Sequence, residues 1–178
     1  MVVEGARLLG QKTMSRPIPI EPAPGQESVW DYPRPPRLER VDKRIEVIFA
    51  GSMIVDAPVS YRVLETSHPP VYYIAPQFIA SGVLQPAAGG SVCEWKGRAE
   101  YFDVLVGQKR AAAAAWRYPS PTAGFAAIAG HVAFYAVPMD ACRVGGEVVT
   151  PQPGGFYGGW ITADIVGPFK GVPGSMGW

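Results

Sequence analysis

The segment Cys93–Tyr101 gathers the residue types that could do chemistry: within nine positions it holds a thiol, two cations, two carboxylates and two aromatic rings. Read as a strand, it places Lys96 and Arg98 on one face and Trp95 on the other. A desolvated lysine can act as a base or as an amine nucleophile, and arginine favours a carboxylate or a phosphate. We therefore predict that this strand lines a functional pocket, with Lys96 and Arg98 facing the ligand.

The other candidate site residues lie elsewhere along the chain, on or next to further predicted strands. We predict Lys96 and Glu65 as the catalytic pair for proton transfer. The predicted substrate-binding residues are Arg98, Tyr101, Trp116, Tyr118, Tyr73 and His131. In such a pocket, aromatic side chains form apolar walls and a few charged groups orient a polar or anionic ligand. The alternative for each residue stays open, because strand charges are usually solvated and aromatic residues usually belong to the core.

Metal and nucleophile chemistry have weaker support in the sequence. The chain has two cysteines, Cys93 and Cys142, and neither belongs to a Cys-x-x-Cys pair. With His68 and His131 they form no recognised zinc-ligand spacing. No Gly-x-Ser-x-Gly elbow is present to carry a nucleophilic serine. The sequence therefore predicts no metal, no cofactor, and two reduced thiols in place of a disulfide.

Length and composition indicate which secondary-structure elements are expected to position these residues. The chain has 178 residues, about one domain, and contains 21 glycines and 19 prolines but only 16 Lys and Arg and 15 Asp and Glu. This composition argues against helical bundles and coiled coils and favours short strands joined by many turns. A net charge of +1 gives no broad basic field for nucleic acid.

No apolar run reaches the roughly 18 to 20 residues of a membrane span. We therefore expect a soluble, cytoplasmic protein with no nucleic-acid or membrane partner. Its expected partner is an unidentified small molecule, and the sequence leaves open a monomer or a homodimer.

Hydrophobic alternation predicts a β protein. Ile45, Val47 and Phe49 share one face of a strand, and Gly145-Gly146 suits a tight hairpin turn. The predicted strands cover 44–49, 53–55, 61–66, 71–74, 92–96, 99–106, 111–115, 131–135, 142–144 and 147–149. A short helix is predicted over 77–84, and a helical turn over 162–166 with Thr162 as its N-cap. The predicted fold class is mainly β: a single domain of short antiparallel strands forming a compact barrel or two-sheet fold, with one or two short helices.

Composition shifts predict three parts along the chain. Residues 1–28 are expected to form an extended or disordered arm, because prolines interrupt them and their apolar positions show no period. The β domain is expected at 29–150, with Trp30 and Tyr32 docked on it. Residues 151–178, the C-terminal extension, are glycine-rich and carry several aromatic residues. We expect this extension to wrap on the domain in an ordered conformation.

Several blocks of the sequence resemble one family. Cys93-Glu-Trp-Lys-Gly-Arg-Ala-Glu-Tyr101 resembles the Cys-Pro-Tyr-Lys-Gly-x-Ala-x-Tyr motif of the family known as domain of unknown function 427. Further blocks match in the same order: Val63-Leu-Glu-Thr66 with Pro70-Val-Tyr-Tyr-Ile74, Ala115-Trp-Arg-Tyr-Pro-Ser-Pro121, and Ile128-Ala-Gly-His-Val-Ala-Phe-Tyr135 with Met139-Asp-Ala141. The extension is similar to that of a longer subgroup. The resemblance implies an antiparallel β fold similar to the small β-tent proteins, and no established reaction.

Two positions depart from the family pattern. The chain has Val55-Asp56-Ala57 where members commonly have a hydroxyl residue after the aspartate, and Glu94 replaces the proline of the motif. A nucleotidyltransferase is the least favoured reading, because Gly51-Ser52 is not followed by the Asp-x-Asp pair that holds magnesium in such enzymes.

The sequence therefore leaves two predicted functions open. The first is a protein that handles a small molecule as a cofactor-independent acid–base enzyme. The alternative is a non-catalytic module that binds a small ligand.

Overall fold

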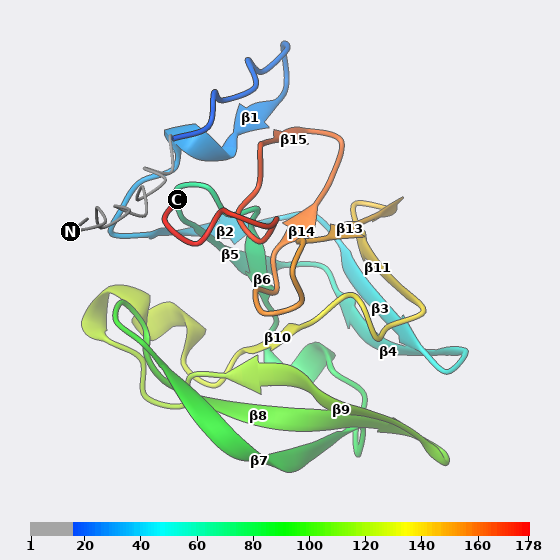
Figure 1. Cartoon of the computed structure of the whole chain (residues 1–178). Helices are drawn as coiled ribbons and strands as arrows, with labels where there is room; N and C mark the ends of the chain where they lie inside the picture. The colour runs from blue at the N-terminus through cyan, green and yellow to red at the C-terminus, as the bar shows by residue number, and fades with distance from the viewer. Residues whose placement is uncertain (1–15) are drawn as a thin grey trace, which may run out of the picture.

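The computed structural model describes residues 16–178 and shows a mainly β protein (Figure 1). One four-stranded antiparallel sheet has the order β10-β9-β8-β7. Its strands are β7 (Leu84–Cys93), β8 (Gly97–Val106), β9 (Lys109–Arg117) and β10 (Val132–Phe134). A second has the order β12-β11-β3-β4. Its strands are β3 (Ile45–Phe49), β4 (Ser52–Ala57), β11 (Ala141–Val144) and β12 (Glu147–Val148).

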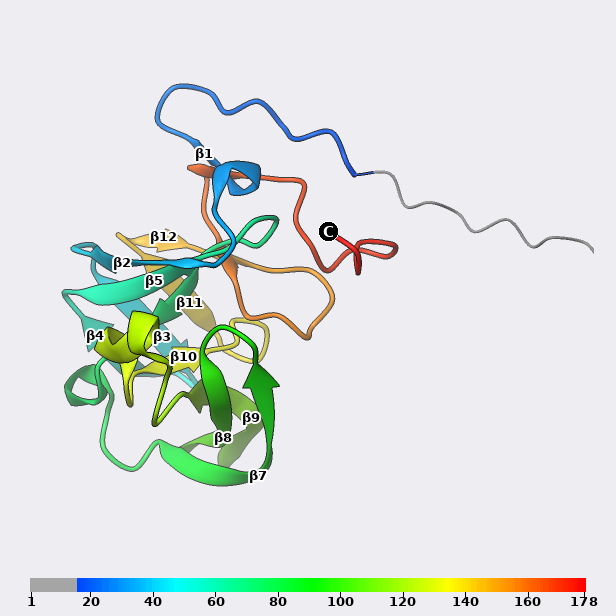
Figure 2. The same cartoon turned by 90° about the vertical axis from the view of Figure 1, so that its left-hand side faces the viewer.

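Smaller sheets and short 3-10 helices complete the fold (Figure 2). A three-stranded sheet has the order β2-β5-β6 and consists of β2 (Arg37–Val41), β5 (Ser60–Leu64) and β6 (Val71–Tyr73). Two-stranded pairs join β13 (Thr150–Pro151) to β14 (Trp160–Ile161) and β1 (Glu27–Ser28) to β15 (Ile165–Val166). The 3-10 helices are η1 (Val29–Asp31), η2 (Pro76–Phe78) and η3 (Ala123–Ile128). No closed barrel forms among residues 16–178, and no helix there is long and apolar enough to cross a membrane.

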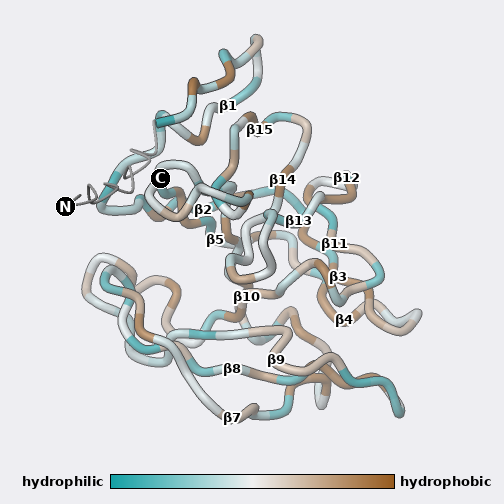
Figure 3. The backbone as a smooth tube through the Cα atoms, viewed as in Figure 1, coloured by the Kyte–Doolittle hydropathy of each residue, from teal (hydrophilic) through white to brown (hydrophobic). Residues whose placement is uncertain are grey.

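The main hydrophobic core lies where the alternation predicted it. Ile45 and Val47 of β3 are fully buried, together with Phe134 of β10. The hairpin turn at Gly145-Gly146 is confirmed, since β11 and β12 pair antiparallel across it. Ala111–Ala115 is confirmed as strand within β9. Figure 3 shows hydrophobic stretches of backbone along β3 and β4.

A second core connects two of the sheets and forms the base of the site. Backbone hydrogen bonds of 2.9 Å in both directions between Ile74 and Val132 tie the chain after β6 to the start of β10. The residues packed across this junction include Val63, Tyr73, Ala99, Trp116, Tyr118, Phe125, Ile128 and Ala133. This junction holds the three-stranded sheet beside the β7–β10 sheet, so their side chains face a common space.

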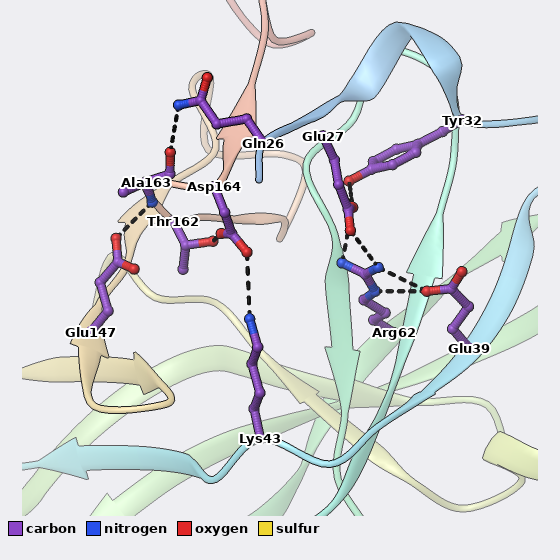
Figure 4. Close-up of polar contacts among 10 residues, drawn as sticks. All are labelled: Gln26, Glu27, Tyr32, Glu39, Lys43, Arg62, Glu147, Thr162, Ala163 and Asp164. Carbon is purple, nitrogen blue, oxygen red and sulfur yellow. Dashed lines mark hydrogen bonds and ion pairs between the residues drawn. The ribbon is translucent and has the colours of Figure 1, made fainter. Parts of the chain in front are cut away.

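Polar contacts tie the N-terminal segment to the body of the protein (Figure 4). Arg62 on β5 forms ion pairs with Glu27 at 3.0 Å and with Glu39 at 2.8 Å. Tyr32 donates to the same Glu27 at 2.7 Å. As expected, Trp30 and Tyr32 are buried, at 8% and 6% exposed. The predicted arm of 1–28 falls partly outside the described residues, and the domain boundaries stay predictions.

The C-terminal extension contributes one large side chain to the main core. Trp160 is 1% exposed, and its indole nitrogen donates to the Phe134 carbonyl at 3.0 Å. Its ring lies 5.4 Å from that of Tyr72, measured between centroids. The absence of a side chain at Gly158 lets the extension pack closely against β9, because a Cβ added at Gly158 would lie 2.1 Å from the Trp116 ring. A glycine is therefore required there for this close approach.

The predicted helix over 77–84 is wrong. Only Pro76–Phe78 forms a 3-10 helix, and Ile79 then pairs with Val55 in an isolated bridge. Phe78, at the end of this 3-10 helix, and Ile79, the extended residue after it, both pack against the main core. Phe78, Ile79 and Val83 therefore all face the core although no α-helix connects them, and their helix-like spacing is accidental.

The predicted helical turn over 162–166 is also wrong. Thr162 is buried, and its hydroxyl donates to the carboxylate of Asp164 in place of capping a helix. Ile165–Val166 instead forms β15, which pairs in parallel with Glu27–Ser28. Pairing with a distant segment of the chain overrides the local helical preference.

Candidate functional site

A cavity of about 390 Å³ opens between the three-stranded sheet, the β7–β8 hairpin and the C-terminal extension. Its size suits a small organic molecule. The lining residues are Val63, Glu65, His68, Pro69, Val71, Tyr73, Ser91, Val92, Cys93, Glu94, Trp95, Lys96, Tyr101, Trp116, Tyr118, Tyr135, Gln152, Phe156, Tyr157, Gly158 and Lys170. Of the eight predicted site residues, the cavity brings together Lys96, Glu65, Tyr101, Trp116, Tyr118 and Tyr73. A second cavity of about 350 Å³ adjoins it and shares Tyr101, Tyr135, Gln152, Tyr157 and Gly158.

A tight turn of the β7–β8 hairpin places Lys96 at this cavity. The interpretation of Cys93–Tyr101 as one strand is wrong, and the separate strands predicted at 92–96 and 99–106 are closer to the structure. The strand β7 ends at Cys93, and β8 begins at Gly97, which is the direct partner of Cys93. Gly97 has a φ of 100°, a conformation that side chains disfavour and that allows the chain to reverse. Thr122 fixes the turn: its amide donates to the Lys96 carbonyl at 3.2 Å and its hydroxyl to the Trp95 carbonyl at 2.6 Å.

Lys96 is a buried cation held against aromatic faces. It is 9% exposed, and its ammonium nitrogen lies 5.6 Å from the Tyr118 ring centroid and 6.0 Å from that of Phe125. Within residues 16–178, no carboxylate lies within 4.0 Å of that nitrogen. Aromatic faces attract a cation by roughly 0.5 to 2 kcal/mol. Lys96 therefore faces the cavity with only part of its lost hydration replaced.

Tyrosine and tryptophan rings form the cavity walls. Trp116 of β9 lies opposite Tyr101 of β8 in strand register, and its ring centroid is 4.6 Å from that of Tyr135. Burial raises the pKa of Tyr73 and Tyr118 above the usual range and raises that of Tyr135 to about 12. These phenols are therefore neutral at physiological pH. They can stack on a ligand and donate hydrogen bonds, but they do not supply a base.

Glu65 lines the cavity with its charge already balanced. Arg34 Nε donates to Glu65 Oε1 at 3.1 Å. The same guanidinium donates to the Thr66 carbonyl at 2.9 Å, which fixes its position. The predicted proton-transfer pair is thus present at the cavity, but its carboxylate member forms an ion pair with Arg34.

Arg98 and His131 are the two predicted site residues that do not line the cavity. Alternation along β8 directs Arg98, which is exposed, to the face opposite Tyr101. His131 packs its ring against Tyr61 with centroids 5.6 Å apart. Lys96 and Arg98 diverge because a hairpin turn separates them where the sequence suggested strand alternation. The binding roles assigned to Arg98 and His131 stay predictions.

Several lining residues with polar or aromatic side chains were not among the predicted site residues, including His68, Gln152, Tyr157 and Lys170. His68 is 7% exposed, and burial, followed by the nearby cations Lys170, Arg34 and Lys96, lowers its pKa to about 3. Lys170 Nζ lies 5.6 Å from the Tyr157 ring centroid. The paired glycines 158 and 159 were the available signal, since they allow the extension to approach the site closely.

The cysteines and potential metal ligands are dispersed. Cys93 lines the cavity and Cys142 is buried in the main core; both are free. Burial raises the pKa of Cys142 to about 12, so its thiol is protonated. Among residues 16–178, no three His, Cys, Asp or Glu side chains come together as a metal site would require. The absence of a metal and of a cofactor stays a prediction.

Comparison with known proteins identifies the family but no activity. No curated protein matches the chain. One family model matches residues 37–145. These residues include the β7–β8 hairpin and most of the cavity lining, whereas Gln152, Tyr157 and Lys170 lie beyond the matched range. Because the match spans more than half of the sequence, the chain belongs to the family described as Domain of unknown function (DUF427).

Proposed function

We propose that this protein binds a small organic anion in the cavity between the β7–β8 hairpin and the C-terminal extension. The observation that carries the proposal is Lys96. Lys96 is 9% exposed and lines the cavity, and its ammonium has aromatic rings but no carboxylate beside it among the described residues. A charge removed from water without a partner is costly, and a bound anion would supply that partner.

The balance of charge around the cavity favours an anion. Lys170 adds a second cation, although its ammonium already donates to the Trp178 oxygen at 3.1 Å, and His68 is neutral because its pKa is about 3. Of the two acidic lining residues, Glu65 is paired with Arg34 and Glu94 is exposed to solvent. The buried part of the cavity is therefore cationic.

The walls define the rest of the ligand. Trp116, Tyr118 and Tyr73 are buried and present ring surface to one another at the base of the cavity. Aromatic walls pack best against a flat, apolar body. The proposed ligand class is thus a planar molecule of modest size that carries a carboxylate or a phosphate.

The cofactor-independent acid–base enzyme is the alternative, with Lys96 and Glu65 as the proton-transfer pair. The Arg34–Glu65 ion pair at 3.1 Å favours binding over catalysis, because it stabilises the charged carboxylate and occupies one of its oxygens. Kinetics would separate the two functions once a substrate is known. Loss of the chemical step in Lys96→Met with affinity retained would indicate catalysis, and parallel loss of affinity would indicate an anchor.

Calorimetric titration with benzoate and its uncharged analogue benzamide tests the proposal. We expect the protein to bind benzoate about tenfold more tightly than benzamide, and Lys96→Met to lose that preference. Lys109→Met is the matched control, because Lys109 is exposed in the β8–β9 hairpin and lies outside the cavity lining. Equal affinity for the two probes, or a benzoate preference that survives in Lys96→Met, would overturn the proposal.

A further inference from the structure

Gln152 of the extension is held in one orientation. Its Oε1 accepts a hydrogen bond from the Gly159 amide at 3.1 Å. Its Nε2 donates to the Lys170 carbonyl at 2.9 Å and lies 3.0 Å from Nδ1 of His68. If the amide were flipped, its NH2 group would face the Gly159 N–H and its oxygen would face the Lys170 carbonyl, and neither pair can form a hydrogen bond. The amide nitrogen therefore faces His68 and donates to it.

This contact fixes the tautomer of His68. Nδ1 accepts from Gln152, so it carries no proton. The imidazole is neutral, because burial and the cations Lys170, Arg34 and Lys96 lower its pKa to about 3. A neutral imidazole has a single N–H, which must then be on Nε2.

The Nε2–H group reaches the cavity. His68 lines the cavity, and Nε2 makes no hydrogen bond to another side chain or carbonyl in the described part of the chain. Within residues 16–178, Ser60 Oγ is the only side-chain nitrogen or oxygen that is fully buried and has no hydrogen-bond partner. Because Nε2 has no hydrogen-bond partner and is not fully buried, part of its surface is accessible. The open space next to His68 is the cavity. The Nε2–H group of His68, a residue that is 7% exposed, is thus available to a ligand.

We infer that His68 determines ligand specificity by donating its Nε2 hydrogen to a neutral acceptor oxygen of the bound anion, and that Gln152 positions it for this task. The inference rests on the proposed function and narrows its ligand class. The ligand is an organic anion that also carries a carbonyl oxygen: Lys96 binds its charge and His68 binds its carbonyl.

The extension is what makes this recognition possible. A Cβ added at Gly159 would lie 2.5 Å from Gln152 Oε1 and 2.6 Å from Pro69 Cγ, so only glycine allows its amide to hold Gln152. Gln152 and Gly159 lie outside the family match of 37–145. The tautomer of His68, a residue within the family region, is thus set by a segment beyond it.

Nuclear magnetic resonance tests the tautomer without a ligand. The chain has two histidines, so His131→Phe leaves His68 as the single imidazole signal. Two-bond nitrogen–proton correlations should show the proton on Nε2, with no titration between roughly pH 5 and 8. In Gln152→Glu a carboxylate replaces the donor, so the proton should move to Nδ1. A proton on Nδ1 in the parent protein, or titration near the ordinary value of about 6.5, would overturn the inference.

Calorimetric titration with matched probes tests the specificity. Ortho-, meta- and para-acetylbenzoate are each compared with the isopropenylbenzoate of the same shape, which lacks the carbonyl oxygen. At least one acetyl compound should bind about fivefold more tightly than its counterpart. At a pH where the imidazole of Gln152→Glu is neutral by nuclear magnetic resonance, this preference should vanish in His68→Phe and in Gln152→Glu. It should persist in the control Lys109→Met, whose residue lies outside the cavity lining.

The outcomes separate the two proposals. Failure of plain benzoate to bind overturns the proposed function. Benzoate binding without any acetyl preference, or a preference that survives in Gln152→Glu, overturns the role of His68. Should His68→Phe fail to fold, Gln152→Glu and the tautomer measurement still decide the matter.

Discussion

Arg62 and Lys96 are two largely buried cations in opposite situations. The Arg62 side chain is 16% exposed and contacts two carboxylates, Glu27 and Glu39. Lys96 is 9% exposed and has aromatic rings but, among residues 16–178, no carboxylate within ion-pair distance. Arg62 joins the N-terminal segment to the three-stranded sheet (Figure 4), whereas Lys96 faces a cavity.

The difference separates a structural charge from a functional one. A buried charge that the fold itself neutralises contributes to stability, and removing it leaves its partners unpaired. A buried charge that has no counter-charge in the fold does not stabilise the protein by ion pairing, and it is available to a ligand. The two cations should therefore respond differently to the same substitution.

The largest effect on stability is expected at Arg62. Arg62→Met should lower the free energy of unfolding by about 2 kcal/mol, because two carboxylates lose charged hydrogen bonds in a partly buried setting. Chemical denaturation followed by tryptophan fluorescence measures this. Arg40→Met is the matched control, since the Arg40–Asp42 pair is largely exposed and should contribute little. Equal stability of the two variants would contradict a structural role for Arg62.

A smaller effect is expected on acid stability. Burial alone would raise the pKa of Glu27, but hydrogen bonds from Arg62 and Tyr32 outweigh it and hold the pKa below its usual value of 4.5. The contribution of Glu27 to stability is thus present above pH 4.5 and is lost as the pH falls through its lower folded-state pKa. Denaturation curves of Arg62→Met should therefore depend less on pH below about 5 than those of the parent protein. An unchanged acid dependence would show that Arg62 does not set the pKa of Glu27.

The smallest effect on stability is expected at Lys96. Methionine retains the packing of the lysine stem and removes a charge that no described carboxylate neutralises. Lys96→Met should therefore lower the free energy of unfolding by less than about 1 kcal/mol, or raise it. The same denaturation assay measures it. A loss as large as that of Arg62→Met would show that Lys96 is structural and would remove the contrast.

Local patterns predicted the strands well, because alternation and glycine turns depend on neighbouring residues. Ile45, Val47 and Phe49 are buried as the alternation required. The pattern failed at Cys93–Tyr101, where the positive φ of Gly97 turns the chain and separates Lys96 from Arg98. A glycine at that position in a strand-like run is compatible with a strand or with a hairpin, and the sequence alone did not distinguish them.

The site was only partly predictable for a different reason. Tyr101 and Trp116 were identified because the family resemblance implies that their strands lie side by side, and in the structure these strands pair directly. His68 meets Gln152 across 84 positions of sequence, through a segment with no regular secondary structure. No local pattern encodes such a contact, so the hydrogen bond that defines His68 became visible only in three dimensions.

The most direct test of the central account is a crystallographic fragment experiment on the full chain. Crystals are soaked separately with para-bromobenzoate, para-bromobenzamide and para-bromobenzylamine, and the bromine is located by its anomalous signal. We expect only the carboxylate to occupy the cavity at high occupancy, with an oxygen about 3 Å from Lys96 Nζ. Equal occupancy by the amide or the amine, or a carboxylate bound away from Lys96, would contradict it.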